Sequence, residues 1–97
     1  MIDHIAINVQ NVKNSAEWYQ NNFGFEIKYI DETWAMLELG NQKLALTIPG
    51  QHPPHIAIRV NSLNDFPNGE FKYHRDGSAY LYDKDPDGNV VEYIHYP

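Results

Sequence analysis

Two histidines, His4 and His55, occupy matching places in two nearly identical stretches of the chain and are the first candidates for chemistry. Residues 4–9 read His-Ile-Ala-Ile-Asn-Val and residues 55–60 read His-Ile-Ala-Ile-Arg-Val, so five of six letters recur at an offset of 51 (55 minus 4). A period of about half the chain indicates two copies of one supersecondary unit. Strand alternation places each histidine opposite the isoleucines, whose side is expected to be the buried apolar one. The histidine faces are therefore expected to form a shared site.

A carboxylate near the end of the chain, Glu92, lies in the last expected strand of the second copy. Aligning the two copies from their last strands places Glu92 on Ala45, an offset of 47 (92 minus 45), because the connections in the second copy are shorter. If Glu92 and the two histidines held a divalent ion together, two neutral imidazoles and one carboxylate would leave the ion partly uncompensated, so it could bind an anionic catecholate or enediolate and act as a Lewis acid. Arg59 is a candidate partner for a substrate carboxylate. The other residues expected to line this pocket are Trp34, Met36, Tyr80 and Tyr82.

The helices and strands that must position these residues are predicted from the spacing of apolar residues and from the glycines and prolines that end each element. In the first copy, helical spacing predicts a helix over residues 15–22 that Gly24 ends, and β-forming runs predict strands over residues 25–30, 34–39 and 43–48. The second copy is expected to have strands at residues 70–74, 79–82 and 90–96, with a tight turn at residues 85–88. Pro67 stops any helix in the segment 61–68, so the second helix is expected to be reduced or absent.

The predicted fold class is α+β, with two β-α-β-β-β modules that form one curved mixed sheet. The modules are residues 1–49 and 55–97, joined by a linker at residues 50–54, in a single domain covering residues 1–97. The helix of the first module is expected against the convex face and the metal in the concave one. The missing second helix leaves sheet surface exposed, which predicts a homodimer.

Composition narrows the class of partner. A formal net charge of -6, with seven Lys and Arg, argues against nucleic acid or a membrane as a partner. The chain contains no cysteine, which excludes disulfides and thiolate ligands. No apolar run is long enough to span a bilayer, and a cytoplasmic location is the default expectation. A small-molecule substrate remains, and 13% aromatic residues suit a ring-lined pocket for it.

Two modules that each open with histidine, together with Asp-Pro-Asp-Gly-Asn-Val-Val-Glu at residues 85–92, resemble the vicinal oxygen chelate superfamily. That superfamily includes glyoxalase I, bleomycin-resistance proteins, methylmalonyl-CoA epimerase and extradiol ring-cleavage dioxygenases. The resemblance covers essentially the whole chain and implies metal ligands at the positions of His4, Ala45, His55 and Glu92. Glyoxalase I has a carboxylate where this chain has Ala45, so the implied set is two histidines and one carboxylate. This set is associated with non-haem Fe(II) oxygenases.

A second motif is similar to the extradiol dioxygenase signature: His74, Leu81-Tyr82, the turn at residues 85–88, and Glu92. Lys72 departs from the signature, and the additional catalytic histidine of those enzymes has no secure counterpart. The resemblance implies that His74 and Tyr82 are catalytic groups that hydrogen-bond substrate oxygens. The predicted function is therefore a metal-dependent enzyme of the vicinal oxygen chelate type, closest in ligand pattern to an Fe(II) extradiol dioxygenase, that acts on a small molecule with two neighbouring oxygens. The implied cofactor is one divalent ion, with Fe(II) favoured and Mn, Ni or Zn possible. The alternatives are a glyoxalase-like isomerase or lyase, and a non-catalytic resistance-type protein that binds a small ligand.

Overall fold

The computed structural model of the protein describes residues 1–97. The chain divides into two compact units, here called the N-terminal unit, residues His4–Pro54, and the C-terminal unit, residues Met1–Asp3 and His55–Pro97. Strand β1 (Ile2–Asn8) contributes residues to both units. Each unit is described separately below.

The N-terminal unit arranges its strands in the order β2-β3-β4-β1. Strands β2 (Glu26–Ile30), β3 (Trp34–Leu39) and β4 (Gln42–Thr47) form an antiparallel meander, whereas β1 runs parallel to β4. A parallel pair needs a long crossover, and the helix α1 (Val12–Phe23) supplies it together with β2 and β3. This arrangement brings the start of the unit beside its last strand.

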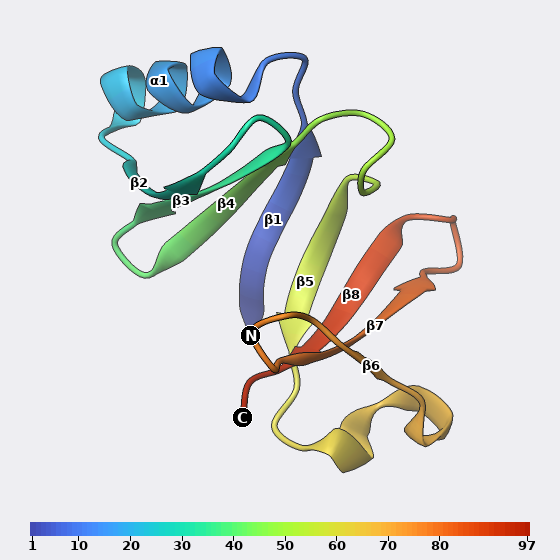
Figure 1. The fold of residues 1–97 in the computed structure, drawn as a ribbon. Coiled ribbons are helices and arrows are strands. Elements are labelled where there is room, and N and C mark those ends of the chain that lie inside the picture. The colour runs from blue at the N-terminus through green and yellow to red at the C-terminus, as the bar shows by residue number, and fades with distance from the viewer. The chain divides into compact units, whose positions relative to one another are not determined.

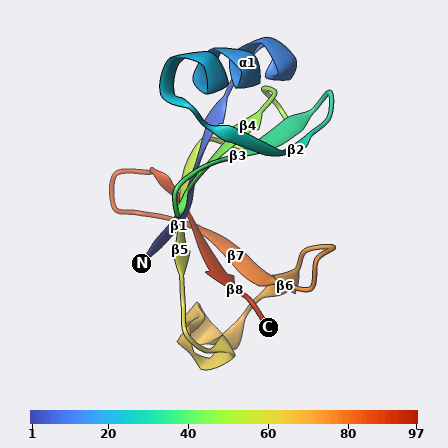
Figure 2. The ribbon, with the colours of Figure 1, turned by 90° about the vertical axis from the view of Figure 1, so that its left-hand side faces the viewer.

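Helix α1 lies against one face of the strands of the N-terminal unit (Figure 2). Asn11 caps its start, since the Asn11 side chain accepts a hydrogen bond of 2.9 Å from the backbone N–H of Asn14. Gly24 ends it in the left-handed conformation, with φ of 81°, which glycine adopts without strain. The buried core beneath the helix consists of Val12, Ala16, Ala35, Leu37 and Leu46.

The C-terminal unit repeats this strand arrangement in the order β5-β8-β7-β6 (Figure 1). Strand β5 (His55–Arg59) runs parallel to β8 (Val90–His95), while β7 (Ala79–Lys84) is antiparallel to β8 and to the short β6 (Lys72–Tyr73). Residues 1–3 join this unit through the backbone N–H of Arg59, which donates to the Met1 carbonyl at 2.9 Å. The edge of β5 is thereby engaged by the start of the chain.

A helix equivalent to α1 is absent from the C-terminal unit. Two short 3₁₀ turns, Leu63–Asp65 and Pro67–Gly69, take its place and are gold in Figure 1. Phe66 between them is buried, and its ring centroid lies 5.3 Å from that of Phe71 and 6.3 Å from that of Tyr93. The prediction of a reduced or absent second helix is confirmed.

Strand register relates the two units residue by residue. In the parallel pair of the N-terminal unit Ala6 lies opposite Ala45, and in that of the C-terminal unit Ala57 lies opposite Glu92. Ala6 and Ala57 hold the same place in the sequence repeat, so Ala45 is the counterpart of Glu92. The alignment of the last strands at an offset of 47 is confirmed.

The two sheet faces of β5 differ from expectation in their burial. His55 and Ala57 are buried, whereas Ile56 and Ile58 are 43% and 39% exposed. The prediction that these isoleucines form a buried face is wrong, and it is also wrong for Ile5, which is 45% exposed. Ile58 differs from its counterpart Ile7 because no helix covers it as α1 covers Ile7. The homodimer expected from this exposed face stays a prediction.

Most element boundaries agree with the sequence to within a few residues. Strand β3 spans the predicted residues 34–39, and α1 begins one turn earlier than predicted because Asn11 provides the cap. Strand β6 covers two residues of the predicted 70–74.

The α+β fold class, with its mixed strand pairing and two related modules, is confirmed. No helix is both long and apolar enough to cross a membrane. The single-domain organisation with a linker at residues 50–54 stays a prediction.

Candidate metal centre

Glu92 lies at the centre of the polar side chains of the C-terminal unit, on strand β8. Its side chain is 2% exposed, and one carboxylate oxygen, Oε1, lies 3.4 Å from Nε2 of His55. Burial of a carboxylate is costly unless cationic or hydrogen-bonding groups compensate it. His55 on the neighbouring β5 lies beside this carboxylate, so the first strand and the last strand of this module bring together two of the three predicted ligands.

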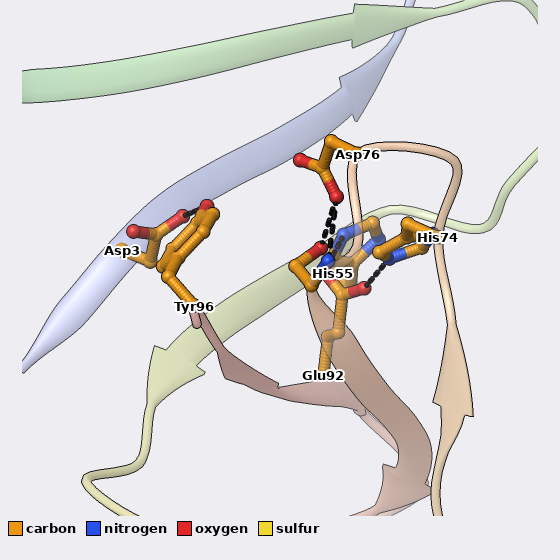
Figure 3. Close-up of polar contacts among 7 residues, drawn as sticks. Asp3, His55, His74, Asp76, Glu92 and Tyr96 are labelled. Carbon is orange, nitrogen blue, oxygen red and sulfur yellow. Dashed lines mark hydrogen bonds and ion pairs between the residues drawn. The ribbon is translucent and has the colours of Figure 1, made fainter.

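His74 provides a second contact to the same carboxylate. Its Nε2 lies 2.8 Å from Oε2 of Glu92 (Figure 3). The His74 ring stacks on Tyr80, with centroids 3.6 Å apart and planes 7° apart. The sequence predicted that His74 binds a substrate oxygen, and the structure places it on the predicted metal ligand.

Tyr82 completes the surroundings of Glu92. The two residues are directly opposed in the antiparallel pair of β7 and β8. Burial raises the pKa of the Tyr82 hydroxyl, and the charge of Glu92 and a hydrogen bond to it raise that pKa further. Tyr82 is therefore a neutral hydrogen-bond donor at neutral pH. Its ring also meets that of His55 edge to face, with centroids 5.2 Å apart.

His4 is the third predicted ligand and belongs to the N-terminal unit. It is buried on β1, opposite Lys43 of β4. Its side chain lies on the face of β1 that also carries Ala6, opposite to the one beneath α1, as strand alternation requires. His4, His55 and Glu92 are all buried and offer two imidazole nitrogens and a carboxylate, a donor set that suits Fe, Mn, Ni or Zn.

The predicted pocket-lining residues fall into different environments. Tyr80 is beside His74, as described above. Met36 on β3 is opposite Ala45, and Trp34 on β3 is opposite Thr47, so both share the face of the N-terminal unit that carries Ala45. The Trp34 ring stacks on Tyr29, with centroids 4.6 Å apart. Substrate binding by Trp34, Met36 and Tyr80 stays a prediction.

Arg59 is engaged by a residue that the sequence analysis did not single out. Its guanidinium lies 2.6 Å from Oδ1 of Asp3, whose side chain is 1% exposed, and its Cζ lies 4.7 Å from the centre of the Tyr96 ring. The Tyr96 hydroxyl donates to Oδ2 of Asp3 at 2.7 Å (Figure 3). Binding a substrate carboxylate would compete with this ion pair. In this structure the Arg59 guanidinium therefore forms an ion pair with the buried Asp3.

Replacing Arg59 by methionine is expected to lower the free energy of unfolding by about 1 to 3 kcal/mol, because a buried carboxylate loses a charged hydrogen-bond donor. The measurement is urea unfolding followed by circular dichroism. The exposed pair of Lys28 and Glu26, 3.2 Å apart, supplies the control, and Lys28→Met is expected to change stability by less than about 1 kcal/mol. Equal losses in the two variants would show that Asp3 does not depend on Arg59.

The sequence was compared with models of known protein families. The model of the glyoxalase/bleomycin resistance protein/dioxygenase superfamily matches residues 1–66, more than half of the chain. The chain belongs to this superfamily. The resemblance inferred from the repeated histidine strands and the C-terminal carboxylate is thereby confirmed. No curated protein sequence matches the chain.

Solved structures share the fold of this superfamily member over nearly its whole length. A glyoxalase/bleomycin resistance protein/dioxygenase superfamily member from Vibrio splendidus 12B01 is 15% identical with a TM-score of 0.73, covering 99% of this chain and 100% of its own. Methylmalonyl-CoA epimerase from Mycobacterium tuberculosis is 17% identical with a TM-score of 0.76, at 99% and 87% coverage. A variant of the Streptomyces coelicolor epimerase in complex with 2-nitronate-propionyl-CoA is 19% identical with a TM-score of 0.72, at 97% and 92% coverage. The TM-scores show a common fold. At identities this low they do not show a common reaction, which must be argued from the residues of the site.

Proposed function

We propose that this superfamily member is a metal-dependent enzyme in which His4, His55 and Glu92 hold one divalent ion, with Fe(II) favoured. The observation that carries the proposal is the burial of Glu92 beside two imidazoles in the C-terminal unit, with Nε2 of His55 3.4 Å from one carboxylate oxygen and Nε2 of His74 2.8 Å from the other. His4 enters as the repeat counterpart of His55. The substrate class is a small molecule with two neighbouring oxygens.

The side chains around Glu92 have separable tasks in this proposal. A bound ion supplies Lewis acidity toward oxygens of the substrate. His55 and Glu92 fix the position of that charge. Tyr82, held neutral by burial, donates hydrogen bonds and does not act as a base at neutral pH. The stacked rings of His74 and Tyr80 add an aromatic wall beside the carboxylate.

The leading reaction is extradiol-type ring cleavage of a catechol. Ala45 supports it, because the counterpart of Glu92 in the other module cannot ligate a metal. A set of three protein ligands leaves open coordination positions, as oxygen chemistry requires. A small flat substrate suits the ring-lined surroundings of Glu92.

An isomerase or epimerase of the same superfamily is the second candidate. Its support is the similarity to methylmalonyl-CoA epimerases, which extends over nearly the whole chain. Such a reaction moves a proton next to a carbonyl and needs no dioxygen. A resistance-type protein that only sequesters a ligand has no need for a buried carboxylate between imidazoles, so the set of His4, His55 and Glu92 counts against that third candidate.

The experiment is elemental analysis of protein purified anaerobically, followed by two assays. Oxygen uptake on a panel of catechols tests the leading reaction, and deuterium incorporation from heavy water into 2-methyl acyl thioesters under argon tests the second. Glu92→Gln is the control in both assays and is expected to be inactive. A chain that holds no divalent metal under these conditions would contradict the proposal as a whole.

A further inference from the structure

The two oxygens of the Glu92 carboxylate have different neighbours. Oε2 lies 2.8 Å from Nε2 of His74, a full hydrogen bond, whereas Oε1 lies 3.4 Å from Nε2 of His55. An ionised carboxylate accepts hydrogen bonds and donates none, so Nε2 of His74 carries the proton in this contact. One oxygen is thus committed to His74, and the other faces the predicted metal ligand His55.

The His74 ring is held in place independently of Glu92. It stacks on Tyr80 with parallel planes, which fixes the orientation of the ring. Its backbone N–H donates to the Ser78 carbonyl at 2.9 Å, and the N–H of Gly77 donates to the His74 carbonyl at 3.0 Å. The His74 backbone is thereby anchored on both sides of a tight turn.

The turn itself is stabilised from within. The Asp76 carboxylate accepts hydrogen bonds from the backbone N–H of Ser78 at 2.8 Å and from its hydroxyl at 2.6 Å (Figure 3). Those hydrogen bonds lower the pKa of Asp76, so the carboxylate stays charged. Ser78 is fully buried. A ring fixed in this way can impose an orientation on the carboxylate that it contacts.

We propose that His74 is a positioning residue that holds Glu92 so that only Oε1 is offered to the metal. This inference rests on the proposed function, since it assigns Glu92 as a ligand. Hydrogen-bond partners of ligating carboxylates fix the ligand geometry and raise metal affinity. Holding Oε2 prevents the carboxylate from chelating through both oxygens, which keeps one more coordination position available to substrate.

This role differs from direct contact between His74 and substrate. Nε2 of His74 is already bonded to Glu92, so this nitrogen does not donate to a substrate oxygen while that bond is kept. His74 also lies on the turn after β6, outside the first and last strands of its module, where the predicted ligands His55 and Glu92 are found. Its effect on the reaction would therefore pass through Glu92.

The test compares Co(II) binding by the unaltered chain, His74→Phe and His74→Gln. Phenylalanine keeps a ring to stack on Tyr80 and removes the donor, whereas the glutamine amide can replace the Nε2–H donor. His52→Gln, which alters an exposed histidine of the N-terminal unit, is the matched control for non-specific binding. The readouts are Co(II) affinity, the visible absorption bands of the bound ion, and the infrared carboxylate stretches that distinguish one-oxygen from two-oxygen ligation.

His74→Phe is expected to lose about 10- to 100-fold in Co(II) affinity and to shift toward the two-oxygen carboxylate signature. His74→Gln is expected to recover most of the affinity and the one-oxygen signature, and His52→Gln to match the unaltered chain. Thermal unfolding of the metal-free proteins identifies any variant that fails to fold; if His74→Phe does, His74→Leu, which also removes the donor, takes its place with the same expected loss. Unchanged affinity and spectra in the donor-free variant would overturn the positioning role alone. No Co(II) binding by the unaltered chain would overturn the proposed function and this inference with it.

Discussion

Glu92→Gln is expected to abolish the stabilisation of the protein by divalent metal. The substitution keeps the shape of a side chain that is 2% exposed and removes the charge that a metal ion needs. A ligand that binds only the folded state stabilises it by about 2.7 kcal/mol at 100 times its dissociation constant, and this whole contribution should disappear. The measurement is calorimetric unfolding with and without Co(II).

The matched control for this result is Glu70→Gln. Glu70 is an exposed carboxylate of the same unit and lies between the second 3₁₀ turn and β6. Its loss should leave the metal-dependent shift in melting temperature unchanged. If Glu92→Gln keeps that shift, the carboxylate at position 92 is not a metal ligand.

Ala45→Glu is the second substitution with a large expected effect. Ala45 is 6% exposed, so a carboxylate there is taken out of water, which costs several kcal/mol when no cation compensates it. Because Ala45 is the register counterpart of Glu92, the new carboxylate is expected to act as a fourth ligand when metal is present. The metal-free protein should lose stability, and the gap between metal-bound and metal-free melting temperatures should widen.

Ala45→Gln separates charge from volume in this experiment. The two side chains fill similar space, but the neutral amide is a poor metal ligand, so the melting-temperature gap should stay near that of the unaltered chain. Oxygen uptake should fall in Ala45→Glu, since a coordination position is filled. A gap that widens equally in both variants would mean that position 45 does not reach the metal.

The repeat predicted the fold well because strand alternation and turn residues are local signals. His4 and His55 identified the two modules. The proline at position 67 predicted that the second helix is reduced or absent, and the structure has two 3₁₀ turns there. Glu92 was found through the C-terminal motif, and its burial agrees with a functional role. A local pattern does not show which sheet faces are covered by other elements. Ile56 and Ile58 were therefore expected to be buried, although they are exposed.

The contacts that the sequence did not reveal join residues far apart in the chain. His74 and Glu92 are separated by 18 positions, and Asp3 and Arg59 by 56. One signal was present: the single mismatch in the repeated hexapeptide is Asn8 against Arg59. The Asn8 amide donates to Thr47 and to the His52 carbonyl within its own unit, whereas Arg59 pairs with Asp3. The mismatched position therefore has different hydrogen-bond partners in the two modules.

Membership of residues 1–3 in the C-terminal unit has a consequence for the order in which the chain can fold. Strands β2, β3 and β4 pair with their sequence neighbours, and such local pairing has a low loop-closure cost. The hydrogen bond from the Arg59 N–H to the Met1 carbonyl joins residues separated by the whole of the N-terminal unit, and β5 pairs in parallel with β8, which follows it later in the sequence. Residues 1–3 can therefore complete the C-terminal unit only after β5 and β8, which follow them in the sequence, have been synthesised, an order that pulse-labelled hydrogen exchange would resolve. Until β5 is synthesised and docks, Asp3 lacks the Arg59 guanidinium that compensates its carboxylate in the folded unit.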